Sequence, residues 1–345
     1  MPGGLFSRII GKAVTIDEEL LMKCLATAAE TASSLIISVF DYGGQPVFDV
    51  IHQLFLTPCG VYVLAFNMEW LLDENSKEHD KCLEFLRFWL NSIVVHTWSN
   101  EERCAAPMVL VGTRKDIVSA PARHEDISTI LCKNFETSLA WLSHLDNDQG
   151  VGANGRARLA FFPVDNTQGR GDLTMLQLMS TIEGAMEKAP YTHTRVPLTW
   201  LRTVDALVAL KRSSLTRNEA TVAAAACGVV ANEVQYLLRF LNDMGVLLWL
   251  DEPSLSDIIV MDPVAFLVTP FTVINCNLTA VSNQDHTRHV LPVHEECERW
   301  HRKEWKKLIQ QGILSSKILP TLWKDFDNQE EILKLLVKFG LLVWL

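Results

Sequence analysis

Short apolar runs alternate with amphipathic segments between residues 35 and 190. The runs at 35–40, 61–66, 108–112 and 159–164 predict four strands, and their continuous apolar character suits strands covered on both faces. Residues 81–98 and 172–188 repeat apolar side chains at helical spacing and predict two helices. This alternation indicates a doubly wound, mostly parallel α/β sheet. Ligands of such sheets bind beyond the carboxyl ends of the strands, so candidate site residues should follow each strand.

The pattern changes after a break at residues 190–197. Helices are predicted at 200–211, 220–227 and 232–243, followed by two strands at 246–250 and 258–261. Thr216 and Glu219 have the spacing of a capping box at the start of the second helix. Three helices and a hairpin are the order of a winged helix, an α+β module.

A weak internal repeat follows. Residues 244–250 and 339–345 align, and the apolar positions of the preceding helices align at the same offset. Residues 277–292 form a polar connector, 312–316 and 319–323 predict a short helical region, and 341–345 predict a strand. We therefore expect three domains, at 1–190, 191–276 and 277–345, with the first and third incomplete at the ends of the chain.

Composition narrows the classes of function. The 345 residues carry a net charge of −10, which argues against binding along nucleic-acid phosphates. The predicted helix 232–243 carries Glu233 and Asp243 against one Arg239, so protein contact is a better role for it than DNA contact. Eight cysteines without a C-x-x-C pair, and no apolar stretch approaching about 18 residues, predict a cytosolic protein without a membrane span.

The first candidate motif is Asp41-Tyr42-Gly43-Gly44-Gln45, directly after the first predicted strand. A carboxylate at a strand end can hold Mg²⁺ through water, and a following glycine lets a backbone N–H approach a terminal phosphate. The neighbouring glutamine can orient an attacking water. The alternative is a tight Gly-Gly turn capped by the aspartate.

The second candidate motif is Gly112-Thr113-Arg114-Lys115-Asp116, after the third predicted strand. The carboxylate of Asp116 can accept hydrogen bonds from N1 and N2 of guanine, an arrangement that adenine cannot match. Arg114 would lie over the base. The alternative is a charged loop that caps the next helix.

Together, the two motifs resemble the third and fourth guanine-nucleotide motifs of the Roc domain, the Ras-like GTPase of Roco proteins. Residues 196–345 resemble the COR region that follows Roc. The resemblance implies a Ras-like fold, Asp41 as the ligand of the Mg²⁺-bound water, and Gln45 as the water-positioning residue. It also implies a GTP or GDP site formed by Asp41, Gly43, Gly44, Thr113, Arg114, Lys115, Asp116, Asp165 and Asn166. Asp165 and Asn166 occupy the place of the fifth motif.

The sequence departs from the family at the phosphate-binding loop. The pattern G-x-x-x-x-G-K-S/T is absent: Gly11-Lys12-Ala13 has Phe6 in place of the first glycine and alanine in place of the hydroxyl residue. Without that cradle the phosphate charges lack partners, so whether this chain alone is a GTP hydrolase is left open. Two hypotheses follow. One is the Roc–COR portion of a signalling switch that orders the segment after Asp41 and dimerises through COR. The other is a nucleotide-free scaffold for protein partners.

Overall fold

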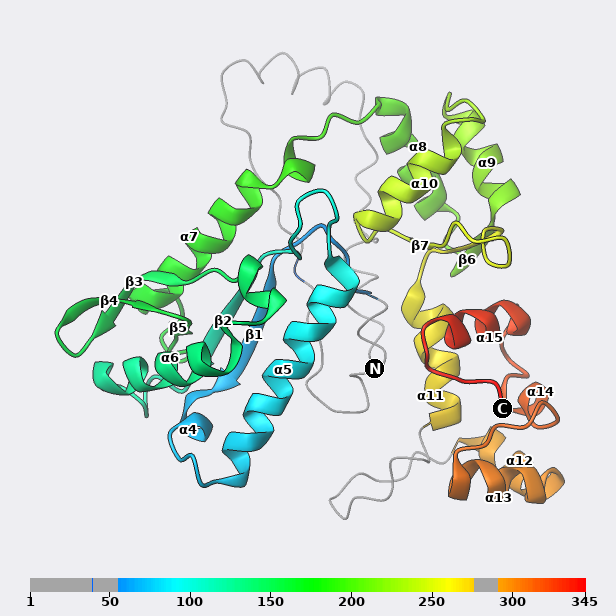
Figure 1. Ribbon diagram of the computed structural model, residues 1–345. Coiled ribbons are helices and arrows are strands. Elements are labelled where there is room, and N and C mark those ends of the chain that lie inside the picture. The colour runs from blue at the N-terminus through cyan, green and yellow to red at the C-terminus, as the bar shows by residue number, and fades with distance from the viewer. Residues whose placement is uncertain (1–38, 40–54, 276–290) are drawn as a thin grey trace. The chain divides into compact units, whose positions relative to one another are not determined.

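The structure is a computed structural model that describes residue 39 and residues 55–275 and 291–345 (Figure 1). The described chain divides into two compact units: Leu56–Arg195 forms one, and Val196–Leu345 belongs to the other. The predicted strand at 35–40 lies outside the described residues apart from Val39, and the polar connector lies outside them up to residue 290.

A parallel three-stranded sheet is the centre of the Leu56–Arg195 unit. Its order is β1 (Tyr62–Asn67), β2 (Met108–Thr113) and β5 (Phe162–Pro163). Tyr62 pairs with Met108 at one end and Asn67 with Thr113 at the other. All three carboxyl ends therefore lie at one edge, which confirms the predicted α/β class with a parallel sheet.

Helices cover both faces of this sheet (Figure 1). The helices are α4 (Met68–Leu71), α5 (Lys77–Thr97), α6 (Pro121–Phe135) and α7 (Leu173–Lys188). Leu64, Phe66 and Leu110 pack into one core with α5 and α6. The alternating residues Val109 and Val111 face the other way and pack with Leu178 of α7. This alternation is the two-residue period of a strand buried on both faces.

The predicted strand at 159–164 is wrong in its extent. Leu159 ends β4 (Gly155–Leu159), which pairs antiparallel with β3 (Asn147–Gly152), and only Phe162–Pro163 join the parallel sheet. The intervening Ala160 and Phe161 are buried but lie outside both pairings. The continuous apolar run thus correctly predicted that these residues are buried. It did not predict that they belong to two different sheets.

The Val196–Leu345 unit begins with helices and a small antiparallel sheet. The elements are α8 (Leu198–Ala209), β6 (Ser214–Thr216), α9 (Arg217–Ala226), α10 (Val234–Asp243), β7 (Leu248–Trp249) and β8 (Ile258–Val260). The strand order is β6-β8-β7. Thr216 and Glu219 form the predicted capping box of α9. Residues 214–216 were not predicted as a strand, because three residues show too little periodicity.

The rest of this unit is helical. A π-helical turn (Val264–Val268) leads into α11 (Thr269–Asn275), and α12 (Pro292–Trp300), α13 (Arg302–Gln311), α14 (Leu319–Leu322) and α15 (Gln329–Lys338) follow. Trp323 is fully buried and donates its indole N–H to the Pro270 carbonyl at 3.0 Å. The prediction of helix at 312–316 is wrong, because Gly312 adopts φ 68° and ends α13.

The internal repeat is visible in two helix ends. Gly245 after α10 and Gly340 near the end of α15 both have φ 69°, a left-handed conformation that favours glycine. In each copy, the residue after the glycine donates its backbone N–H to a carbonyl five residues earlier. Val246 bonds to Leu241 O and Leu341 bonds to Leu336 O, both at 2.9 Å. The predicted strand at 341–345 is wrong, because a strand needs a partner and no described strand pairs with these residues.

Candidate functional site

At the carboxyl-end edge of the parallel sheet, α4 follows β1 directly, and loops follow β2 and β5. Asn67 ends β1 and caps α4, with its side chain accepting from the Glu69 N–H at 3.0 Å. Residues 114–117 follow β2 and residues 164–172 follow β5. The Lys115 N–H bonds to Val164 O at 3.3 Å, so the loops after β2 and β5 are directly connected.

The end of β2 and the loop after it are tied to β1 and α4 on one side. The Thr113 hydroxyl donates to Phe66 O at 3.0 Å. Arg114 has φ 70°, and its guanidinium lies 3.4 Å from the Glu69 carboxylate, with both side chains exposed. A left-handed arginine is unusual, and here it turns the chain sharply after the strand.

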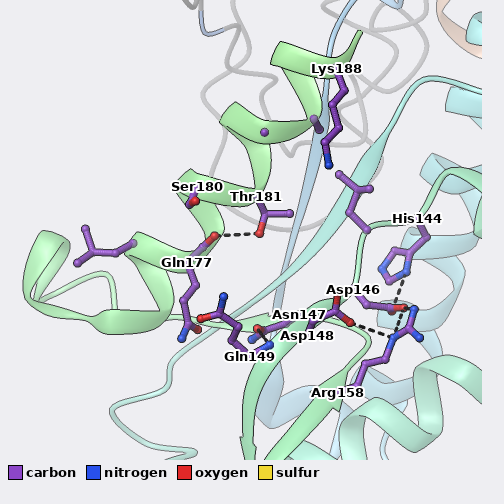
Figure 2. Close-up of a pocket in the computed structure, with 14 residues that line it drawn as sticks. His144, Asp146, Asn147, Asp148, Gln149, Arg158, Gln177, Ser180, Thr181 and Lys188 are labelled. Atoms are coloured by element: carbon purple, nitrogen blue, oxygen red, sulfur yellow. Dashed lines mark hydrogen bonds and ion pairs between the residues drawn. The ribbon is translucent and has the colours of Figure 1, made fainter.

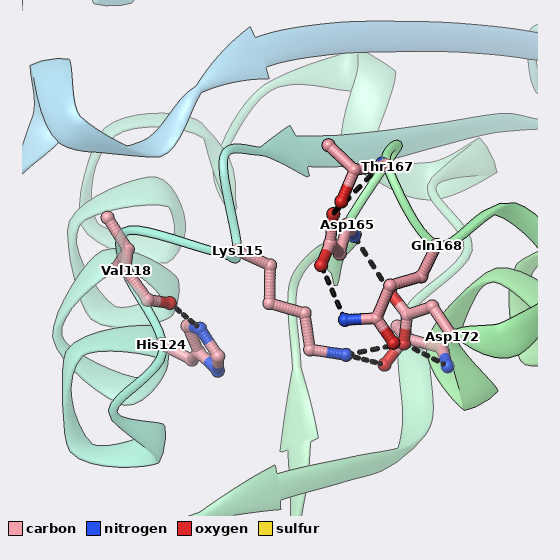
Figure 3. Close-up of polar contacts among 8 residues, drawn as sticks. Lys115, Val118, His124, Asp165, Thr167, Gln168 and Asp172 are labelled. Carbon is pink, nitrogen blue, oxygen red and sulfur yellow. Dashed lines mark hydrogen bonds and ion pairs between the residues drawn. The ribbon is translucent and has the colours of Figure 1, made fainter.

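On the other side the same loop is tied to the start of α7, as Figure 3 shows. The Lys115 ammonium donates to Asp172 Oδ1 at 2.6 Å and to the Thr174 hydroxyl at 2.9 Å. Asp172 is the N-cap of α7 and also accepts from the Thr174 N–H. Its side chain is 4% exposed, against 28% for Lys115. Burial raises the pKa of Asp172, but Lys115 and two backbone N–H groups outweigh burial and hold it below its ordinary value.

Asp116 differs from the three residues before it. Its side chain is exposed and makes no hydrogen bond or ion pair with any part of the chain that the structure describes. Thr113, Arg114 and Lys115 are engaged by β1, α4 and the start of α7. The motif therefore anchors the three residues before one carboxylate and leaves that carboxylate available to a ligand.

The loop after β5 is organised by a buried carboxylate. Asp165 accepts from the Thr167 N–H at 2.9 Å, the Thr167 hydroxyl at 2.6 Å and Gln168 Nε2 at 2.5 Å. Its own N–H donates to Asp172 Oδ2 at 2.8 Å. The bonds from Thr167 and Gln168 lower the pKa of Asp165. Asn166 lies on the same loop and is exposed.

The sequence-predicted residues fall into two groups. Thr113, Arg114, Lys115, Asp116, Asp165 and Asn166 come together at the edge of one sheet. Asp41, Gly43, Gly44 and Gln45, predicted for Mg²⁺, phosphate and water, lie outside the described residues. Sequence reasoning missed Glu69, Gln168 and Asp172. Only Asp172 had a local signal, since an aspartate directly before an amphipathic segment is typical of an N-cap.

A polar concavity lies between α7 and the loop leading into β3 (Figure 2). It has a volume of about 680 Å³ and is lined by His144–Gln149, Arg158 and one side of α7 from Leu176 to Lys188. Arg158 Nε donates to Asp146 at 2.8 Å. His144 Nδ1 lies 3.2 Å from Asp146 but without hydrogen-bond geometry, and His144 Nε2 and Asn147 Nδ2 are buried without partners. Carboxylates and cations balance here, so the lining favours no charged ligand.

Within the described residues, no His, Cys, Asp and Glu side chains gather in a group of three or more that could hold a metal ion. No described helix combines the length and apolar character needed to cross a bilayer.

The fold and these loops define a class: an α/β unit with a parallel sheet and polar loops at its carboxyl edge, followed by a region of helices and a small antiparallel sheet. No protein-family model matches the chain. In sequence it is 32% identical over 85 residues, a quarter of its length, to the probable serine/threonine-protein kinase pats1 of Dictyostelium discoideum. It is 25% identical over 239 residues, 66% of its length, to the probable kinase roco6 of the same organism.

In structure the chain is similar to the RocCORdC part of Roco2 from Methanosarcina barkeri, solved with GDP. The TM-score is 0.55 at 16% identity, covering 87% of this chain and 74% of that one. The chain spans 2% of the length of pats1 and 9% of roco6. These likenesses confirm the resemblance to Roc–COR proteins of the Roco family drawn from the motifs.

Proposed function

We propose that the chain is the Roc–COR part of a Roco-type signalling protein and that its Leu56–Arg195 unit takes part in binding a guanine nucleotide. The observation that carries the proposal is Asp116. An exposed carboxylate without a partner in the described chain stands at the carboxyl edge of a parallel sheet, directly after anchored residues. This is the edge where such sheets bind ligands.

Guanine fits this carboxylate by its chemistry. Two oxygens of one carboxylate match the adjacent N1 and N2 donors of guanine, and adenine offers no such pair. Arg114, turned outward by its positive φ and partnered by Glu69, would flank the base. Asn166 on the neighbouring loop supplies a further exposed amide at the same edge. The GDP bound to the Roco2 neighbour supports this ligand class.

The remaining parts of the proposal concern residues 41–45 and the region after Arg195. Asp41 would hold the Mg²⁺-bound water, Gly43 and Gly44 would approach the terminal phosphate, and Gln45 would orient the attacking water. The β6-β8-β7 sheet with α8, α9 and α10 would be a winged-helix-like COR module that contacts protein partners, including a second copy. The order of these elements supports that assignment.

Calorimetry tests the proposal directly. The chain is titrated with GDP and with GTPγS in the presence of Mg²⁺, and with ADP as the matched control. We expect saturable binding of both guanine nucleotides and none of ADP at the same concentrations. Equal binding of ADP would remove guanine recognition from this edge. Absence of heat with all three ligands would favour the nucleotide-free scaffold. The chain lacks the G-x-x-x-x-G-K-S/T pattern of a phosphate-binding loop, and this lack would then explain why it binds no nucleotide.

A further inference from the structure

Asp172 joins the loop after β5 and the start of α7 to a lysine that lies 57 residues away in the sequence. Its Oδ1 accepts from the Lys115 ammonium at 2.6 Å and from the Thr174 N–H at 3.0 Å, and its Oδ2 accepts from the Asp165 N–H at 2.8 Å. The donors belong to the loop after β2, to the first turn of α7 and to the loop after β5. One carboxylate therefore joins both loops of the candidate base site to one rigid helix.

These contacts exceed what a helix cap needs. An N-cap aspartate requires only the amide of the first turn, here Thr174. Lys115 is 57 residues away in sequence and adds a charge partner, and Asp165 adds a backbone donor from the start of the loop that ends at Asp172. A carboxylate as buried as Asp172 is stable in its charged form only when it is paired and hydrogen-bonded.

The contacts continue into the loop that presents Asn166. The Asp165 backbone is fixed by Asp172, and the Asp165 side chain in turn binds Thr167 and Gln168 (Figure 3). At the other end, Lys115 stands directly before Asp116. Both acceptors of the Lys115 ammonium, Asp172 Oδ1 and the Thr174 hydroxyl, are provided by the chain itself. Lys115 is thus directed toward the protein, whereas Asp116 is left for the ligand.

We propose that Lys115 and Asp172 are positioning residues of the base site. Their ion pair fixes the loop after β2 relative to the loop after β5, so that Asp116 and the loop carrying Asn166 contact the same base. The identity of the base rests on the proposed function, whereas the coupling of the two loops is a property of the chain without ligand. Lys115 itself does not bind the nucleotide.

Amide hydrogen exchange of the ligand-free chain tests the coupling. In Lys115→Met, exchange across residues 165–171 should rise about tenfold or more, the scale of losing a hydrogen bond to a charged group. Exchange in α5, on the opposite face of the sheet, should stay within about twofold. Lys115→Arg should restore most of the protection, since arginine keeps the charge and can donate to both acceptors. Arg158→Met removes an ion pair from the same unit and should leave residues 165–171 unchanged.

The second arm asks whether coupling sets base recognition. The affinity ratio of GDP to IDP is measured for the wild type, Lys115→Met and Lys115→Arg, because inosine lacks the N2 donor that Asp116 would bind. The ratio should fall severalfold in Lys115→Met and return in Lys115→Arg. An unchanged ratio would reduce the pair to a structural contact and overturn the positioning role.

The two arms separate the possible failures. If the wild type binds no GDP, the proposed function fails, and the exchange arm alone decides whether the pair couples the loops. If Lys115→Met leaves exchange at 165–171 unchanged, or raises exchange equally in α5, the coupling is wrong whatever the nucleotide results. Protection lost in Lys115→Met and regained in Lys115→Arg supports it.

Discussion

Two polar clusters in the Leu56–Arg195 unit are built from similar residues with different results. Around Asp172, a buried carboxylate is paired with Lys115 and with backbone donors. Around Asp146, a carboxylate is paired with Arg158, whose side chain is 71% exposed. In the first cluster none of the buried polar side-chain atoms is left unbonded, whereas in the second His144 Nε2 and Asn147 Nδ2 have no partner.

The difference between the two clusters distinguishes a buried ion pair that fixes the backbone from a solvent-exposed pair that does not. A buried ion pair whose remaining hydrogen-bonding capacity is also filled resists movement, because any displacement exposes an uncompensated charge. A pair open to solvent exchanges its partner for water at little cost. The Asp172 cluster can therefore hold two loops in place for a ligand. The Asp146 cluster lines a concavity without fixing it.

The largest effect should come from removing the lysine of the first cluster. Lys115→Met leaves the carboxylate of Asp172 buried without its cation, and we expect the free energy of unfolding to fall by about 2–3 kcal/mol. Arg158→Met, the matched change in the second cluster, should lower it by about 1 kcal/mol or less. Urea denaturation of both variants measures the difference. Equal losses would erase the distinction between the clusters.

The next largest effect should come from acid acting on Asp172. Because the pKa of Asp172 is lowered in the folded state, its stabilisation is present above the unfolded value of about 3.8 and is lost as pH falls through the folded pKa. Asp172→Asn should therefore be less stable than the wild type at neutral pH, by about 1–2 kcal/mol. That gap should narrow steadily below about pH 4. Urea unfolding at a series of pH values measures it, and a gap independent of pH would show that the charge of Asp172 does not matter.

The smallest effect is expected at His144 in the second cluster. His144 is 1% exposed by side chain and stacks on Trp141 with ring centroids 4.1 Å apart. His144→Phe keeps the stacking and removes two poorly bonded nitrogens, so stability should change by no more than about 1 kcal/mol, toward stabilisation. Thermal unfolding near neutral pH measures it. A clear loss of stability would mean that the His144–Asp146 contact stabilises the fold after all.

Sequence patterns predicted the parts of this unit that depend on local order. The β1 and β2 strands were found because buried strands read as continuous apolar runs. Thr113, Arg114 and Asp116 could be proposed as site residues from the sequence because their motif is contiguous and follows a strand. The β3-β4 hairpin was missed because Gly150, Gly152 and three charged side chains dilute its apolar alternation.

The missing parts depend on contacts between distant segments. The role of Asp172 could not be read from its neighbours, since Lys115 is 57 residues away and Asp165 contributes only a backbone N–H. Likewise, nothing local indicated that Glu69 would partner Arg114. A single sequence reports which residues have suitable chemistry, but three-dimensional pairing decides which of them are anchored and which one is left for a ligand.

If Asp116 is the carboxylate that recognises guanine, a single substitution should change which base the chain prefers. Asp116→Asn should leave the free energy of unfolding within about 0.5 kcal/mol of the wild type, because the side chain is exposed and unbonded in the described chain. Calorimetry with GDP and with xanthosine diphosphate should show a preference for guanine in the wild type and for xanthine in the variant. An unchanged preference for GDP in Asp116→Asn would show that Asp116 does not recognise guanine.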